Sequence, residues 1–129
     1  MNHNAPRRIV IWIDHREALL AVFVADQLQQ EEELFSDAGP HTHGGGWSQH
    51  RIDAHRHEQL KHFYDEIIDH LGMVDEIMIL GPGQAKHELK TRIEHHKGLR
   101  GKVVSLESSD KLSEEQFIMR AEEYFALKS

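Results

Sequence analysis

Ile9-Val10-Ile11-Trp12-Ile13 is the stretch of sequence that decides the fold. Five consecutive apolar residues, four of them β-branched, predict a strand that is covered on both faces and lies at the centre of a sheet. The polar turn Asp14-His15-Arg16-Glu17 and a second apolar run, Ala18–Val24, follow directly, and this pattern predicts a β-hairpin. A third strand is expected over Leu28–Phe35, where three consecutive glutamates are typical of a sheet edge protected by charge.

Helical and strand patterns alternate in the rest of the chain. The first helix has apolar residues at helical spacing, followed by Gly72, a residue well suited to end a helix in a left-handed conformation. The expected elements are a helix over His50–Leu71, a strand over Glu76–Leu80 that runs into Gly81-Pro82-Gly83, a helix from Ala85 that ends at Gly98, and a strand over Lys102–Leu106.

A last helix begins at Ser113, because Ser113 and Gln116 form a capping-box pattern and Leu112 can pack on Phe117. The predicted order is therefore βββαβαβα. This order describes an antiparallel meander followed by two right-handed crossover units. We expect a single α/β domain over residues 1–129, with a mixed five-stranded sheet and helices packed on it.

Composition narrows the function classes. At 129 residues with 39% hydrophobic content, the chain can form one real core. The absence of cysteine excludes disulfides and thiolate metal sites. No apolar run is long enough to span a bilayer and the first residues lack a signal-peptide pattern, so we expect a cytoplasmic protein with no membrane partner. The sequence leaves the oligomeric state open.

Charge is distributed unevenly along the chain. The net charge of −7 argues against a nonspecific nucleic-acid binder. Residues 86–102, however, carry a net +4 and leave −11 for the rest of the chain. This window is either a face that meets phosphate or a solvated helix of mixed charge.

A glycine-rich loop precedes the first helix, with the sequence His41-Thr42-His43-Gly44-Gly45-Gly46-Trp47-Ser48-Gln49-His50-Arg51. Three adjacent glycines allow backbone conformations that are closed to other residues and permit close approach to a partner. We expect residues 41–50 to form a mobile insertion in the domain. Trp47 either stacks on a base or on an apolar surface of a partner, or folds back over the sheet edge.

Three segments carry a resemblance to a known family: the opening strand and turn over residues 9–18, the glycine loop with Arg51 and Arg56 beyond it, and Gly81–Leu89. Over residues 7–127 the chain resembles the middle domain of the archaeo-eukaryotic release factors and of pelota, together with small bacterial relatives called translational machinery proteins. The resemblance implies a ribonuclease H-like fold and association with the ribosome, rRNA or tRNA.

In release factors the loop reads Gly-Gly-Gln and promotes hydrolysis of peptidyl-tRNA. In this chain Gly45, Gly46 and Ser48 match the family loop, whereas Trp47 occupies the glutamine position. Glutamine offers an amide beside the attacking water, and tryptophan offers only an indole donor. The resemblance therefore implies a non-hydrolytic ribosome- or RNA-associated protein.

The same resemblance suggests which residues contact the partner. Gly44, Gly45, Gly46, Trp47 and Ser48 would probe it. Phosphates would be contacted by Arg51 and Arg56 and by a basic face that comprises Lys86, Lys90 and Lys102. Gly81-Pro82-Gly83 before a helix is either an anion site or a tight strand-to-helix turn.

A metal is the second chemical hypothesis. His55, Glu58 and His62 fall at i, i+3 and i+7 on one helix face. With His41 or His43 folded over them, they could hold zinc, copper or nickel. The alternative is a solvated face that carries exposed histidines.

Two other functions remain open. The first is a hydrolase of peptidyl-tRNA or of a phosphodiester, the latter through a histidine-bound metal. The second is a protein-interaction or metal-binding module without RNA. A carboxylate nuclease would draw on Asp14 with Glu58 or Asp65, but the fourth expected strand ends in glycine and supplies no third carboxylate.

Overall fold

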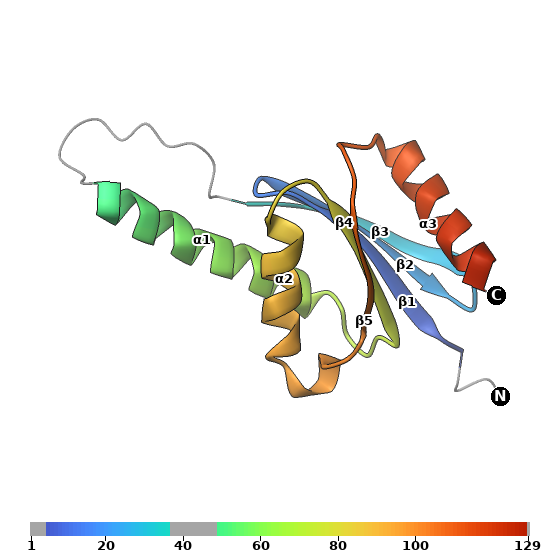
Figure 1. Cartoon of the computed structure of the whole chain (residues 1–129). Helices are drawn as coiled ribbons and strands as arrows, with labels where there is room; N and C mark the ends of the chain where they lie inside the picture. Colours follow the sequence, from blue (N-terminus) through green and yellow to red (C-terminus); the bar gives the residue numbers. More distant parts are fainter. Residues whose placement is uncertain (1–4, 37–48, 129) are drawn as a thin grey trace.

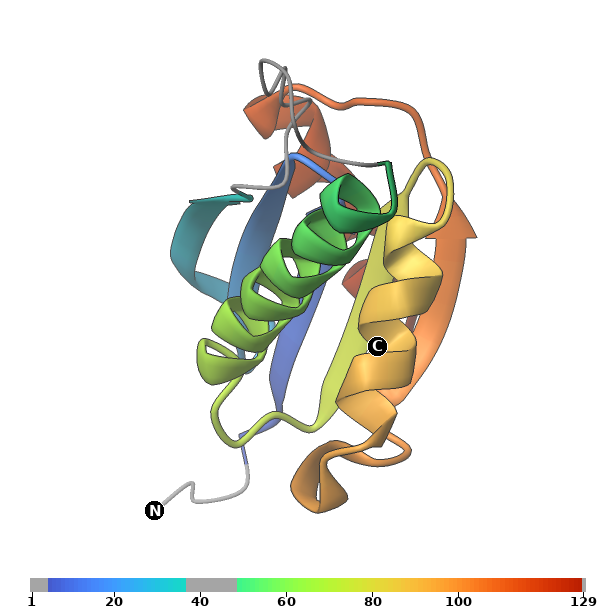
Figure 2. The same cartoon turned by 90° about the vertical axis from the view of Figure 1, so that its left-hand side faces the viewer.

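A five-stranded mixed sheet forms the centre of the molecule, with α1 and α2 on one face and α3 on the other (Figures 1 and 2). The computed structural model describes residues 5–36 and 49–128. The strands are β1 (Arg7–Ile13), β2 (Glu17–Val24), β3 (Gln27–Phe35), β4 (Glu76–Gly81) and β5 (Val103–Ser108). The helices are α1 (Gln49–Asp69), α2 (Ala85–Glu94), the short 3-10 helix η1 (Lys97–Leu99) and α3 (Glu114–Lys128). The predicted order βββαβαβα is confirmed.

β1 is the central strand, as the sequence predicts. The sheet order is β3-β2-β1-β4-β5, in which β1 pairs antiparallel with β2 and parallel with β4. Ile9, Ile11 and Ile13 pack under α1 and α2, whereas Val10 and Trp12 pack under α3. All five are fully buried, which explains why this strand reads as a continuous apolar run.

Local signals in the sequence account for the ends of α1 and α3. Gly72 has φ +57 and follows the last turns of α1, in the left-handed conformation expected of a residue just beyond a helix end. At the start of α3, the Ser113 backbone N–H donates to Gln116 Oε1 at 2.9 Å and the Gln116 N–H donates to Ser113 Oγ at 3.1 Å. The predicted capping box is therefore formed.

α2 is shorter than the sequence suggests. The expectation of a helix that continues to Gly98 is wrong, because the α-helix ends at Glu94. Beyond that point the backbone hydrogen bonds join residues three apart instead of four: the His95 N–H donates to Arg92 O and the His96 N–H donates to Ile93 O. A 3-10 turn then buries Leu99, so the tighter turn continues the core where the α-helix stops.

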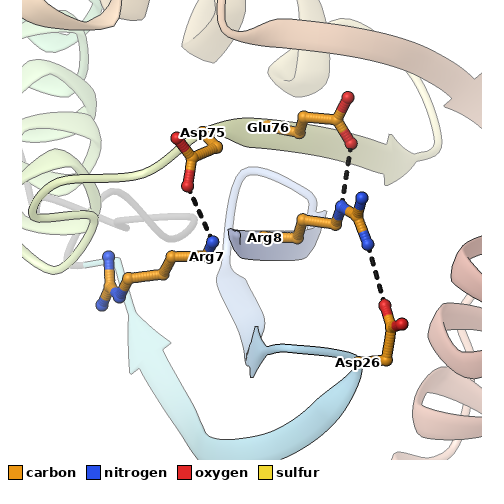
Figure 3. Close-up of polar contacts among 5 residues, drawn as sticks. All are labelled: Arg7, Arg8, Asp26, Asp75 and Glu76. Atoms are coloured by element: carbon orange, nitrogen blue, oxygen red, sulfur yellow. Dashed lines mark hydrogen bonds and ion pairs between the residues drawn. The ribbon is translucent and has the colours of Figure 1, made fainter. Parts of the chain in front are cut away.

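Charged contacts close the end of the sheet where β1 begins (Figure 3). The Arg7 backbone N–H donates to Asp75 Oδ2 at 2.8 Å. The Arg8 side chain reaches Glu76 Oε1 at 3.1 Å and Asp26 Oδ1 at 2.8 Å. One guanidinium thus links the β2–β3 turn to the start of β4.

Candidate functional site

The last described residue before the glycine loop, Ser36, lies beside one end of the sheet. β1, β3, β4 and β5 all end there, because β3, β4 and β5 run in the same direction as β1. The Ser36 N–H, just before the loop, donates to Arg16 O in the β1–β2 turn at 2.8 Å. Five loop residues singled out from the sequence lie outside the described residues: Gly44, Gly45, Gly46, Trp47 and Ser48. His41 and His43 also lie outside them.

The β1–β2 turn is held by its own aspartate. Asp14 Oδ1 accepts the backbone N–H of Arg16 at 2.8 Å and that of Glu17 at 2.9 Å. A carboxylate that satisfies two turn N–H groups stabilises the turn. This gives Asp14 a structural role at the position considered for a nuclease carboxylate.

The β4–α2 turn presses closely against the end of β1. Gly81 has φ +153, and a Cβ built there would lie 2.0 Å from the carbonyl oxygen of Ile13. Only glycine allows this approach. Gly83 has φ +61 and faces open space, so its glycine is needed for conformation alone.

Lys86 belongs to that turn and not to an exposed basic face. The residue is only 5% exposed, and its Nζ donates to Gly83 O at 2.6 Å. The expectation that Lys86 extends a surface of lysines is therefore corrected. An ammonium on the first turn of a helix can fold back onto the preceding turn because the carbonyl lies three residues away, and burial then favours that internal partner.

The positive window of residues 86–102 does not form one surface either. Lys90 is half-buried on α2, near its middle. Lys102 precedes β5 and lines a hollow with Arg7 and Asp75 at the opposite end of the sheet. The charge is contiguous in sequence, but α2 carries the chain from one end of the sheet to the other, so the cations are separated.

The first half of α1 is the exposed element that continues from the glycine loop. The buried residues of α1 begin at Leu60, and Figure 1 shows the start of this helix lying away from the strands. Arg51 is exposed and Arg56 half-buried in this segment. Ile52, the first apolar residue of α1, is only half-buried. The structure thus places both predicted arginines on the protruding first half of α1, which follows the loop in the sequence.

A polar cluster that the sequence analysis missed joins three elements below this segment. Glu88 Oε1 on α2 accepts a hydrogen bond from the Tyr64 hydroxyl of α1 at 2.5 Å and lies 3.1 Å from His15 Nε2 in the β1–β2 turn. Burial, and then the bond to Glu88, raise the pKa of Tyr64 far above its usual value. Tyr64 therefore remains a protonated donor that ties α1 to α2.

A second link between the two helices is a two-pronged ion pair. Arg92 Nε and Nη2 donate to the two carboxylate oxygens of Asp65 at 2.7 and 2.9 Å. The hydrogen bonds from Arg92 lower the pKa of Asp65, with its charge adding to the effect. The bidentate geometry aligns α2 on α1 and keeps Asp65 ionised.

The predicted metal ligands remain on the exposed side of α1. His55, Glu58 and His62 are all exposed, and Glu58 Oε1 lies 3.5 Å from Lys61 Nζ. Within residues 5–36 and 49–128, no three histidine, aspartate or glutamate side chains are grouped closely enough to hold a metal ion. A metal site completed by His41 or His43 stays a prediction.

Comparison with known proteins identifies the family to which this arrangement belongs. A model of bacterial archaeo-eukaryotic release factor family 10 matches residues 3–123. The chain belongs to this family. No curated protein matches it. Among the described residues of this family member, no helix has the length and apolarity needed to cross a membrane.

Solved structures of Pelota and of a translation termination factor share the fold. Archaeoglobus fulgidus Pelota matches with a TM-score of 0.55 at 14% identity, over 93% of this chain and 32% of its own. The archaeal translation termination factor aRF1 matches with a TM-score of 0.57 at 15% identity, over 94% and 40%. Thermoplasma acidophilum Pelota matches with a TM-score of 0.57 at 19% identity, over 94% and 34%. The chain thus spans from about a third to two fifths of the length of these proteins.

Proposed function

We propose that this family 10 protein is a cytoplasmic, ribosome- or RNA-associated factor that does not hydrolyse peptidyl-tRNA. The observation that carries the proposal is the family match over residues 3–123 together with tryptophan after the glycines. Release-factor family membership makes the ribosome the first partner to test. Trp47 stands where the family resemblance places the catalytic glutamine, and its indole has no carbonyl to orient a water molecule.

The anchoring of the loop supports a probing role. The loop leaves β3 at a hydrogen bond to Arg16 O and rejoins the chain at the exposed start of α1. Arg51 is exposed in this first half of α1. In the proposal, Trp47 stacks on a base or an apolar surface while Arg51 and Arg56 contact phosphate.

Peptide release from programmed ribosomes tests the absence of hydrolysis. The wild-type protein should release no more peptide than buffer, because the residue that would orient water is missing. The informative variant is Trp47→Gln, and Trp47→Ala serves as its matched control without an amide. Release by Trp47→Gln alone would support entry of the loop into the catalytic centre, whereas release well above buffer by the wild type would refute the proposal.

A further inference from the structure

A hollow lies at the end of the sheet where β1 begins, and it has a volume of about 800 Å³. The start of β1, the end of α1 and η1 meet at this end of the molecule (Figure 2). The hollow is lined there by apolar side chains of Val24, Ile68, Val74 and Leu99. Val24 is half-buried and the other three are buried. The floor of the hollow is therefore an apolar surface that belongs to the core.

Met73 stands at the rim of this hollow, in the loop between α1 and β4. It is 93% exposed, whereas the other exposed large apolar residues of the described chain range from 42% to 63%. The loop is held on both sides of Met73. Gly72 has φ +57, and the Asp75 N–H donates to Arg7 O at 2.8 Å while Asp75 Oδ2 accepts the Arg7 N–H at 2.8 Å. Because the backbone is already fixed, burying the Met73 side chain against a partner orders little more of the chain.

Charged side chains of both signs surround the floor. Arg7 and Lys102 lie on the rim with Asp69 and Asp75. Within the part of the chain that the structure describes, none of these four side chains forms an ion pair with another side chain. His96, which is exposed, also lines the hollow. The charges of the rim are therefore balanced and available to a partner.

An apolar centre inside a polar rim is the arrangement found at protein–protein interfaces. The uniform negative charge of a nucleic acid does not match a rim that carries two carboxylates. A second copy of this chain matches it, because a two-fold contact brings each surface against itself and lets the cations of one rim meet the carboxylates of the other. An exposed methionine beside an apolar hollow is self-complementary in the same way, because each copy supplies both the side chain and the recess.

We propose that two copies of the chain associate through this end, with Met73 of each packed into the hollow of the other and Arg7 and Lys102 opposite Asp69 and Asp75. The hollow is lined by 13 residues, fewer than the 20–30 that each side of a standard interface contributes, so we expect a weak dimer with a dissociation constant in the micromolar range. The dimer goes beyond the proposed function and does not depend on RNA. Its contact lies about 30 Å from the start of α1, the length of a 21-residue helix, so Arg51 stays accessible to another partner.

Sedimentation velocity of the full chain, from low micromolar to a few hundred micromolar, measures this self-association. The mass should rise from 15.0 kDa toward twice that value. Met73→Glu should raise the dissociation constant at least about tenfold, because it puts a charge into the apolar hollow and like charges near the two-fold axis. Met73→Leu keeps the apolar contact and should keep the dimer. The matched control is Met119→Glu, the same change on α3 at a residue that is 59% exposed, and it should change the constant less than about twofold.

The absence of cysteine allows a second measurement. A short bismaleimide should join two chains of the Met73→Cys variant, and it should not join two chains of Met119→Cys at the same concentration. Circular dichroism confirms that each variant is folded. A wild type that stays monomeric throughout the range, or a dimer that Met73→Glu leaves unchanged, would overturn the proposal. Equal weakening by Met73→Glu and Met119→Glu, or equal cross-linking at the two positions, would overturn it as well. None of these results would bear on the proposed function, which ribosome sedimentation tests separately.

Discussion

Replacing Gly81 with alanine places a methyl group against the end of the central strand. The added Cβ would lie 2.0 Å from Ile13 O and 3.1 Å from the carbonyl carbon. An ordinary contact with that oxygen needs well over 3 Å, so β1 and β4 must separate by more than an ångström. Neither strand can shift freely, because each is paired on both sides within the sheet.

Two costs add at this position. A side chain at φ +153 is strained by about 1–3 kcal/mol, and forcing apart packed strands costs about 1–3 kcal/mol more. We therefore expect Gly81→Ala to lower the free energy of unfolding by about 2–6 kcal/mol, with a midpoint of about 4 kcal/mol. Gly83→Ala is the matched control two residues away. Its φ is +61 and nothing lies within 4 Å of the added Cβ, so only about 1–2 kcal/mol is expected.

Urea unfolding followed by circular dichroism measures both variants. The close approach of the β4–α2 turn to Ile13 predicts that Gly81→Ala is the less stable by about 2–3 kcal/mol, the difference between the midpoints of the two expected costs. If Gly81→Ala costs no more than Gly83→Ala, the contact with Ile13 O does not constrain the turn. The placement of Lys86 at the end of the sheet would then need another explanation.

Two further perturbations test contacts on opposite faces of the sheet. The Asp65 carboxylate has a lowered pKa because Arg92 donates to it, so its contribution to stability is present above its unfolded pKa and is lost as the pH falls through the folded pKa. The difference in free energy of unfolding between wild type and Arg92→Gln should therefore be constant above about pH 5 and shrink when urea titrations are run at more acidic pH. A difference that does not change with pH would contradict this. Ser113→Ala removes the cap oxygen that accepts the Gln116 N–H and should lower the free energy of unfolding by about 1 kcal/mol in the same assay. Ser113→Gly should lower it by only a few tenths of a kcal/mol. Equal stability of Ser113→Ala and wild type would show that the capping box does not stabilise α3.

Much of the fold was predictable because its signals are local. The apolar run over residues 9–13 predicted a central strand. Gly72 and Ser113 marked helix ends through backbone conformation and capping, which depend on neighbours within a few residues. The end of α2 was missed for the same reason: the residues after Glu94 do not forbid a helix, and tertiary packing of Leu99 selects the 3-10 turn.

The candidate site was harder to predict because its contacts join distant segments. His15, Tyr64 and Glu88 meet only when the hairpin turn and two helices come together. The burial of Lys86 depends on how α2 lies on the sheet. Closeness in the sequence likewise does not show that Lys90 and Lys102 share a surface, because the chain turns between them. Hydrophobic periodicity records which face is buried, but it does not record which polar side chains meet.

Sedimentation of the purified native protein with ribosomes, at a series of salt concentrations, tests the central claim most directly. The protein should sediment with ribosomes at low salt and be released as salt rises, because contacts to phosphate displace bound counterions. Trp47→Ala should weaken this association while leaving its salt dependence nearly intact, since stacking releases no counterions. No association at low salt, or association that neither salt nor Trp47→Ala changes, would contradict a ribosome-associated function.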